Sequence, residues 1–362
     1  MNKQTKDLIL LNMMQDIGHI RLRALLAEFK TTESILKAPI KSLQQIKGIG
    51  PNIAESIKKA PSTHDIDREL SLIKKHNVKV VTIFDKDYPE DLKNTYDPPI
   101  VLYTKGELKN PGALSIAIVG SRRCTQYGLK AAQRIARELS AYKITIVSGM
   151  ARGIDTAAHK GAMEANAQTI AVLGNGLASI YPPENRKLAC EIIKHGMLVS
   201  EFCMEMPPHK QNFPRRNRVI SGLSKGVVVV EAAAKSGALI TADFALDEGR
   251  DVFAVPGGAG YATSQGTNNL IREGAKLAES ASDIIEELGI NSKELVKDQT
   301  SGLNFNNECE EDVYNLLSDE PKDIEYLTEA ASSKPKKMRV ALLQLEIKGL
   351  VKQLPGKLYV KA

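Results

Sequence analysis

The chain has 362 residues, of which 43% are hydrophobic and 25% charged, and its formal net charge at pH 7 is +6. This length allows two or three domains, and the balance of apolar and charged residues is that of a soluble globular protein. Because aromatic residues make up only 5% and tryptophan is absent, we do not expect an aromatic-rich surface for carbohydrate or lipid.

The N-terminus and the cysteines indicate a cytoplasmic protein. Asn12 and Asp16 interrupt the first apolar run, so a signal peptide is not expected, and no apolar stretch approaches the roughly 20 residues of a membrane helix. The four cysteines form neither a CxxC pair nor a metal-ligand spacing with the six histidines. Such scattered thiols are typical of a reducing cytosol. We expect neither a metal nor a cofactor.

Residues 1–76 are predicted to form a small all-α module of short helices separated by glycine or proline. Within it, residues 43–54 (LQQIKGIGPNIA) have the pattern of a helix-hairpin-helix, and residues 17–26 form a looser copy. Glycines permit a tight hairpin and expose backbone N–H groups at the next helix start, where a phosphate can sit. The same motif often serves helix packing, so DNA contact and a purely structural role both stay open.

From residue 78 the pattern changes to short apolar runs that alternate with helical stretches. Near-continuous valine and isoleucine in such runs indicates burial on both faces, as in a parallel sheet covered by helices. Residues 78–289 are therefore predicted to form a doubly wound, Rossmann-like α/β domain with a mostly parallel sheet. The predicted strands cover residues 78–84, 114–119, 144–147, 169–173, 197–200, 226–230 and 251–255.

Residues 290–307 are polar and typical of a linker, and residues 308–362 resemble a winged helix. Its predicted elements are three amphipathic helices over 312–317, 324–331 and 338–348 and a hairpin over 350–360. Acids gather in residues 298–329 and bases in residues 334–361, which points to an anionic partner or to contact between the two segments. The third helix has a basic start but an apolar body, so contact with duplex DNA and docking of a protein both stay open.

A cluster of cations follows the predicted strand at 197–200. Residues 209–218 (HKQNFPRRNR) hold four cations in ten residues, and no acid occurs between Glu205 and Glu231. Arginine offers a bidentate fork to phosphate, lysine a mobile charge, and the ring of Phe213 a surface on which a base can stack. The combination favours a surface for single-stranded nucleic acid, although a solvated basic loop would have a similar composition.

The other strand ends carry residues of the same kind. In open α/β sheets, ligands bind beyond the carboxyl ends of the strands. There the sequence has glycine, serine, asparagine and cations in the segments 120–123, 148–155, 174–176 and 235–241. Such loops can cradle phosphate through backbone N–H groups. Because their number exceeds the need of one mononucleotide, they favour a polymeric ligand.

We therefore predict a nucleic-acid-binding site at this edge of the sheet. Arg122, Lys210 and Arg216 are expected to hold phosphates and Phe213 to stack on a base. Arg218 belongs to the same set. Arg216 and Arg218 could also be buried structural cations, and for Arg218 the two roles are equally compatible with the sequence. The remaining candidates are Gly149 and Asn175, for close backbone approach, and Ser121, Arg123, Arg152, Asn212, Asn217, Ser236 and Thr241.

Enzymatic alternatives have weaker support. The sequence has no GxxxxGK[ST] loop and no GxGxxG after residue 120, which argues against a P-loop ATPase and against NAD binding. Asp155 and His159 are one helical turn apart and close to Ser148, but Asp155 is better placed to cap its helix and His159 to pack inside the protein. Glu231 could act as an acid at a strand end, although an ion pair with an arginine is the favoured state.

These motifs resemble those of the DNA-processing protein A family (DprA, also called Smf). The resemblance rests on the segments GSR at 120–122, SGMARGID at 148–155, NFPRRNR at 212–218, SGLS at 221–224, SGALIT at 236–241 and NNLIREGA at 268–275. It covers the whole α/β domain, and the helical module and the winged-helix tail fit the family's three-part layout more loosely.

The resemblance implies a recombination mediator that is not an enzyme. Such proteins bind single-stranded DNA that enters during natural transformation, protect it and help to load RecA recombinase onto it. The family's DNA pocket would use Arg122, Lys210 and Phe213 in this sequence. The resemblance also implies a homodimer formed through the α/β domain.

One departure concerns the nucleotide phosphoribohydrolases, which share this α/β fold and carry a PGGxGTxxE loop with a catalytic glutamate. Here Pro256-Gly257-Gly258-Ala259-Gly260 is followed by Tyr261-Ala262-Thr263-Ser264, so the threonine and the glutamate are missing. This difference argues against hydrolysis but leaves a nucleotide-binding enzyme, with Glu231 as its acid, as the alternative. A third hypothesis is an adaptor whose winged helix docks another protein.

Overall fold

A nine-stranded sheet organises the larger part of the computed structural model. The structure describes residues 1–14, 16–290, 308–317, 321–331, 335–354, 356 and 358–361. The chain divides into two units, Met1–Ser292 and Lys293–Ala362. The predicted linker lies outside the described residues except for Ile290. None of the described helices is both long and apolar enough to cross a membrane.

The sheet has the mostly parallel, doubly wound arrangement that was predicted. Its strands are β1 Lys79–Thr82, β2 Val101–Gly106, β3 Ser115–Val119, β4 Thr145–Ser148, β5 Thr169–Val172, β6 Met197–Ser200, β7 Gly226–Val229, β8 Asp251–Ala254 and β9 Lys276–Leu277. Their order is β1-β2-β6-β5-β4-β3-β7-β8-β9, and all neighbours from β6 to β9 are parallel. The chain winds outward from β3 in both directions, so the topological switch point lies between β3 and β7.

All seven predicted strands are present, and two further strands were missed. β2 pairs antiparallel with both β1 and β6, and β9 extends the parallel edge by two residues. β2 is buried, with Tyr103 fully inaccessible, because it lies between two strands and beneath helices. The apolar run of β2 follows two prolines and is not flanked by the helical patterns that marked the other strands, so the sequence analysis missed it.

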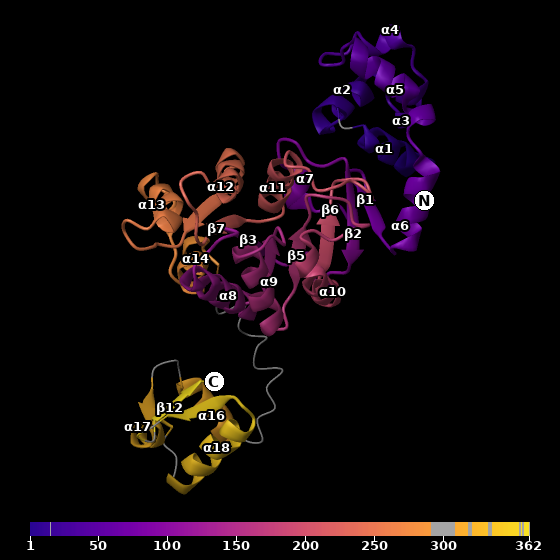
Figure 1. The fold of residues 1–362 in the computed structure, drawn as a ribbon. Helices are drawn as coiled ribbons and strands as arrows, with labels where there is room; N and C mark the ends of the chain where they lie inside the picture. Colours follow the sequence, from indigo (N-terminus) through magenta and orange to yellow (C-terminus); the bar gives the residue numbers. More distant parts are fainter. Residues whose placement is uncertain are drawn as a thin grey trace. The chain divides into compact units, whose positions relative to one another are not determined.

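Helices cover both faces of the sheet (Figure 1). They are α7 Glu90–Lys93, α8 Gln126–Ala141, α9 Ile154–Glu164, α10 Arg186–His195, α11 Asn212–Gly222, α12 Gly237–Asp247, α13 Gln265–Arg272 and α14 Ala281–Glu287. The helices α8, α9 and α14 share one apolar core with β3, β4 and β7, whereas α11, α12 and α13 pack in a core on the other face. Alternate side chains of each buried strand point into the two cores, as a parallel sheet requires.

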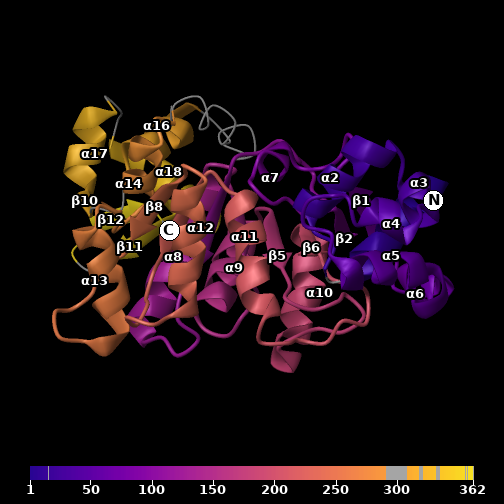
Figure 2. The ribbon, with the colours of Figure 1, turned by 90° about the horizontal axis from the view of Figure 1, so that it is seen from above.

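The N-terminal helices lie beside the β1–β2 end of the sheet (Figure 2) and share a buried apolar core with it. They are α1 Lys3–Met13, α2 His19–Phe29, α3 Thr32–Lys37, α4 Ile40–Leu43, α5 Pro51–Thr63 and α6 Ile66–Lys75. Leu8 and Leu11 belong to the same buried cluster as Tyr103 and Leu198 of the sheet. Between α4 and α5, Gly48 has a φ of +87° and Gly50 precedes α5, which gives the predicted hairpin its turn.

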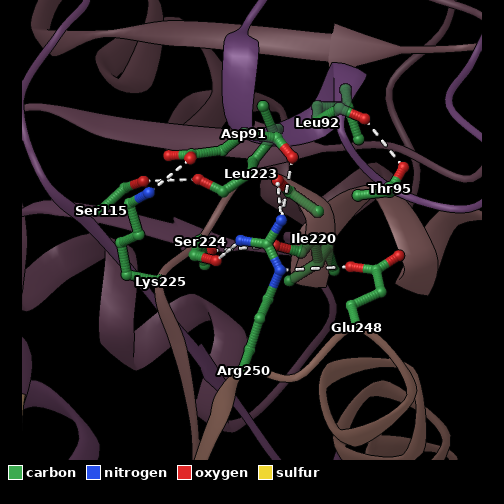
Figure 3. A network of polar contacts seen from close by, with 11 residues as sticks. Asp91, Leu92, Thr95, Ser115, Ile220, Leu223, Ser224, Lys225, Glu248 and Arg250 are labelled. Atoms are coloured by element: carbon green, nitrogen blue, oxygen red, sulfur yellow. Dashed lines mark hydrogen bonds and ion pairs between the residues drawn. The ribbon is translucent and has the colours of Figure 1, made fainter.

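Arg250 fastens the C-terminal end of α11 to the start of β8 (Figure 3). Its guanidinium donates to the carbonyls of Gly222 and Ser224, to the Asp91 carbonyl at 2.9 Å, and to the Glu248 carboxylate at 3.2 Å. The adjoining Lys225 ammonium contacts the Asp91 carboxylate at 2.5 Å. These bonds satisfy carbonyls that the last turn of a helix leaves unpaired, and they fix the far end of α11.

The second unit is a winged helix, as predicted. It contains α16 Glu308–Leu316, α17 Ile324–Ala330 and α18 Pro335–Ile347, with a three-stranded sheet of β10 Lys322–Asp323, β11 Val351–Leu354 and β12 Leu358–Lys361 in the order β10-β12-β11. Val313, Leu327 and Leu342 form part of its core. On α18, Leu343 and Ile347 are exposed apolar residues, which leaves the alternative of protein docking open beside that of DNA contact.

Candidate nucleic-acid interface

Loops from three parallel strands and the start of α11 line one small pocket at the carboxyl edge of the sheet. The pocket holds about 40 Å³ and is lined by Arg122, Gly149, Ala151, Arg152, Gly174, Tyr181, Pro182, Phe213 and Arg216. Arg122 follows β3, Gly149 and Arg152 follow β4, and Phe213 and Arg216 lie on α11. Five of the predicted site residues are thus brought together although they span almost a hundred positions of the sequence.

Phe213 lines this pocket and is partly exposed. The guanidinium carbon of Arg122 lies 4.9 Å from the ring centroid and that of Arg216 lies 6.0 Å from it. The ring of Tyr181 is 5.9 Å away and tilted by 39°. A Cβ atom on Gly174 would come within 2.8 Å of the Phe213 ring, so glycine after β5 makes room for the aromatic side chain. Cation and ring are therefore paired at the surface, as an aromatic stacking site with an adjacent phosphate site requires.

Arg216 is the buried cation beneath the ring, with only 5% of its surface exposed. Its Nη1 donates to the carbonyls of Gly149 at 2.6 Å and Val172 at 2.8 Å, which ties the ends of β4 and β5 to α11. A Cβ on Gly149 would lie 2.2 Å from that nitrogen, so only glycine fits there. Burial lowers the pKa of Arg216 to about 10, although the Asp155 carboxylate opposes this shift. The side chain therefore stays charged at neutral pH.

Arg122 and Arg123 are exposed on the loop that follows β3. Two hydrogen bonds fix the backbone of the loop. The Ser121 N–H donates to the Glu231 carbonyl at 2.6 Å, and the Ser121 hydroxyl accepts from the Arg123 N–H at 3.1 Å. Gly153 has a φ of +75°, and a Cβ there would lie 2.3 Å from the Ser121 carbonyl oxygen. The backbone is thus fixed while both guanidinium groups remain in solvent.

Arg152 and Lys210 differ in how far they are neutralised. Arg152 is exposed but forms an ion pair with Glu184, and this pairing lowers the pKa of the Glu184 carboxyl. Lys210 is exposed three residues before Phe213. Among the described residues, no acid lies within ion-pair distance of its ammonium group. Lys210 is therefore a cation whose charge is available to an external anion.

Four other candidates have their side chains occupied inside the protein. Asn175 is buried and its amide donates to the Ser179 carbonyl at 2.8 Å, while the Asn212 amide donates to the Pro207 carbonyl at 3.3 Å. The Asn217 amide donates to the Gly237 carbonyl at 3.1 Å and its oxygen accepts from Arg216. Arg218 forms an ion pair with the buried Glu201, as its structural interpretation predicted. These side chains fix the loops around the pocket.

Ser236 and Thr241 lie at the N-terminal end of α12, apart from the residues that line the pocket. The Ser236 hydroxyl accepts from the Ala238 N–H at 3.3 Å and caps the helix. Thr241 is buried. Gly174, from the predicted strand-end segment 174–176, does line the pocket, whereas Tyr181 lines it and was not predicted. The Tyr-Pro-Pro sequence at residues 181–183 was the available signal for a loop of defined shape.

The residues considered for a catalytic triad do not form one. The Ser148 hydroxyl donates to the Ile118 carbonyl at 2.6 Å, and the His159 ring contacts the Thr169 hydroxyl at 2.7 Å through Nδ1. His159 is fully buried, in agreement with its predicted structural role. The predicted helix cap at Asp155 is wrong: Gly153 precedes the helix, and the Asp155 carboxylate accepts from the Ala151 N–H at 3.2 Å within the preceding loop.

The expected pairing of Glu231 with an arginine is also wrong. Its carboxylate is buried and accepts from the N–H of Thr125 at 3.0 Å and from the Thr125 hydroxyl at 3.1 Å. A Cβ on Gly128 would lie 2.0 Å from it, so the next helix closes over the group. Two donors from one residue satisfy the carboxylate as an arginine would. Within the part of the chain that the structure describes, no cluster of His, Cys, Asp and Glu could hold a metal ion.

Acidification is expected to destabilise the α/β unit through His159. Burial, with a smaller contribution from Arg216, lowers the pKa of His159 to about 3 from its ordinary 6.5. The unfolded chain therefore binds a proton between these two values that the folded chain does not bind, so stability is lost as pH falls through this window. Between about pH 7.5 and about pH 5 the expected loss is about 2 kcal/mol. Urea unfolding of the wild type and of His159→Asn at both pH values measures it, and equal losses in the two proteins would contradict the assignment.

The fold and the pocket define a class: an α/β protein with an arginine-lined pocket at the carboxyl edge of its parallel sheet, followed by a winged helix. Comparison with known proteins makes this more specific. The family model described as DNA recombination-mediator protein A matches residues 79–289, and that of the DprA winged helix domain matches residues 304–357. The chain belongs to the DNA-processing protein A (DprA/Smf) family, as its motifs predicted.

Individual relatives agree with this membership. The Smf protein of Escherichia coli is 39% identical over 302 residues, which cover 80% of this chain and 79% of that protein. The structure of DprA from Streptococcus pneumoniae has a TM-score of 0.70 at 34% identity and covers 79% of this chain and 99% of that chain. The structure of DprA from Helicobacter pylori, which addresses the single-stranded DNA binding mode of that protein, has a TM-score of 0.53 at 32% identity. It covers 58% of this chain and 95% of that chain.

Proposed function

We propose that this protein binds single-stranded DNA across the carboxyl-end loops of its sheet. The observation that carries the proposal is the exposed guanidinium of Arg122 above the ring of Phe213, at 4.9 Å. A phosphate that binds Arg122 would place the adjacent base beside the ring. The description of the Helicobacter pylori relative supports the same class of ligand.

Two groups of residues contribute differently. Arg122, Lys210 and Arg123 supply exposed charge to phosphates, and Phe213 supplies the stacking surface. Arg216 adds a buried positive charge, and its hydrogen bonds hold the strand ends in register with α11. The supporting residues are Gly149, which admits the Arg216 side chain, and Asn175, Asn212, Asn217 and Arg218, which fix the loops.

The biological role that we propose is that of a cytoplasmic recombination mediator rather than an enzyme. It would protect single-stranded DNA, load RecA onto it during natural transformation, and act as a homodimer formed through the α/β domain. Membership of a family described as recombination mediators supports this role. No feature of the site favours the alternative of nucleotide hydrolysis, since the Glu231 carboxylate is buried and engaged by Thr125.

Fluorescence anisotropy with labelled single-stranded and duplex oligonucleotides of equal length, across a salt series, tests the proposal. We expect preferential binding of the single strand, with an affinity that falls as salt rises because phosphate contacts release counterions. Binding that is absent at low salt, or equal for single strand and duplex, would overturn it.

Lys210→Ala is expected to weaken the binding of single strands of every sequence to a similar extent. One phosphate contact contributes about 0.7 to the slope of log affinity against log salt for a single strand, so the slope should fall by about that amount. The same titration measures it. Lys75→Ala, which removes an exposed lysine from α6, is the matched control. An unchanged slope in Lys210→Ala would show that this lysine does not contact phosphate.

A further inference from the structure

We propose that a DNA strand that leaves the pocket continues along the outer face of α8, on a stripe formed by Tyr127, Lys130, Arg134 and Arg137. This inference rests on the proposed function, because it extends the path of the same ligand. It assigns a second contact surface for a single strand, outside the pocket and on a different element from α11. We call these four residues the α8 stripe.

The spacing of these residues places them on one side of the helix. They are separated by three, four and three positions, which is the periodicity of neighbours on one helix face. All four are exposed. They line a groove of about 420 Å³ together with Ala131 and Gln133 of α8 and Glu164 of α9. This groove is about ten times roomier than the pocket at Phe213, which cannot enclose a nucleotide.

The α8 stripe follows in the chain the loop that carries Arg122 of the pocket. Arg122 and Arg123 lie in the loop that leads into α8, and Thr125, the N-cap of the helix, is held by the buried Glu231 carboxylate. The Tyr127 hydroxyl donates to the Pro256 carbonyl at 3.1 Å, which fixes the ring at the carboxyl edge of the sheet. Ten residues separate Tyr127 from Arg137, so the stripe extends for about 15 Å. The exposed cations Arg122 and Arg123 thus precede the α8 stripe directly in the chain, and this is the path that we infer for a strand bound at Arg122.

The charges of the α8 stripe suit a phosphodiester backbone. Arg134 is engaged by Glu138 at 3.1 Å, and Glu164 accepts a hydrogen bond from Gln133. Over the described residues, Lys130 and Arg137 have no acid within ion-pair distance. Lys130 and Arg137 are thus available to bind phosphate, and the ring of Tyr127 on the same helix face is 57% exposed. A positively charged groove with an aromatic ring on which a base can stack is what the binding of single strands without sequence preference uses.

The experiment compares two lengths of oligothymidylate on the full chain. A strand of about five nucleotides, near the lower end of known single-strand site sizes, is long enough to contact Arg122 and Phe213 only, whereas we expect one of about 20 also to reach α8. In Lys130→Gln/Arg137→Gln we expect unchanged affinity for the short strand. For the long strand, the loss of two phosphate contacts should lower the salt slope by about 1.4 and the affinity by about 25-fold near 0.1 M salt.

Lys74→Gln/Lys75→Gln, which removes two exposed lysines from α6, is the matched control, and circular dichroism checks that each variant is folded. The inference is overturned if the long strand loses no more affinity than in the control, or if both lengths lose affinity equally. Failure of the wild type to bind either length would instead reject the proposed function. The two failures are therefore distinguishable.

Discussion

Arg216→Met is expected to lower the free energy of unfolding by about 3–5 kcal/mol, the range found when one partner of a buried charged network is removed. Methionine fills a similar volume but cannot donate to the carbonyls of Gly149 and Val172, which lie at the ends of two central strands. An unpaired buried carbonyl costs about 1–3 kcal/mol. Asp155, whose pKa is already raised by burial, also loses the nearest cation that favours its charged form.

Chemical denaturation of the wild type and the variant measures the effect, with Arg215→Met as the control. Arg215 is the adjacent residue, but its side chain is 44% exposed and lies 3.7 Å from Glu201, so its removal should cost no more than about 1 kcal/mol. Equal stabilities of the two variants would contradict the assignment of Arg216 as the residue that joins β4, β5 and α11.

Six of the seven strands that the sequence predicted, β3 to β8, are parallel strands whose side chains are almost all buried. Residues 197–200 of β6 and 226–229 of β7 are short runs of apolar residues between helical patterns, and burial on two sides requires such runs. The antiparallel β2 follows two prolines and is defined by its pairing with β1 and β6. Pairing between segments distant in sequence leaves little local signal, so β2 was missed.

The boundary between the N-terminal module and the sheet shows a similar limit. The change of pattern near residue 78 marks a change of secondary structure, but it does not mark the end of a core. Leu8 and Leu11 pack in the same cluster as Tyr103, and the Glu69 carboxylate of α6 accepts from the Met204 N–H at 2.9 Å. Residues 1–292 therefore form one compact unit. Composition along a chain shows which residues are apolar, but not which apolar faces meet.

The sequence predicted which loops form the candidate site, but not which of their side chains face solvent. Strand ends in a parallel sheet meet at one edge, so Arg122, Gly149 and Phe213 were expected to lie close together, and the pocket unites them. Which polar residues face inward was not predictable, because Asn217 and Lys210 have similar sequence surroundings. The structure separates them: Asn217 holds Gly237, whereas Lys210 extends into solvent.

Phe213→Ala is expected to weaken the binding of single-stranded DNA by about 1–3 kcal/mol, which is a factor of about 5 to about 150 in affinity. The ring lies between Arg122, Tyr181 and Arg216 at the mouth of the pocket, where a base can reach it. Because every base has a stacking face, the loss should be similar for oligothymidylate and oligoadenylate.

An abasic oligonucleotide separates stacking from a structural role of the same ring. If Phe213 stacks on a base, Phe213→Ala should weaken the binding of an intact strand but change that of an abasic strand of equal length only slightly. Phe213→Leu, which keeps an apolar side chain in contact with Gly174, should lose most of the affinity for the intact strand as well. Equal penalties on the intact and abasic strands would show that the ring only supports Arg122, since phosphate contacts alone would then carry the binding.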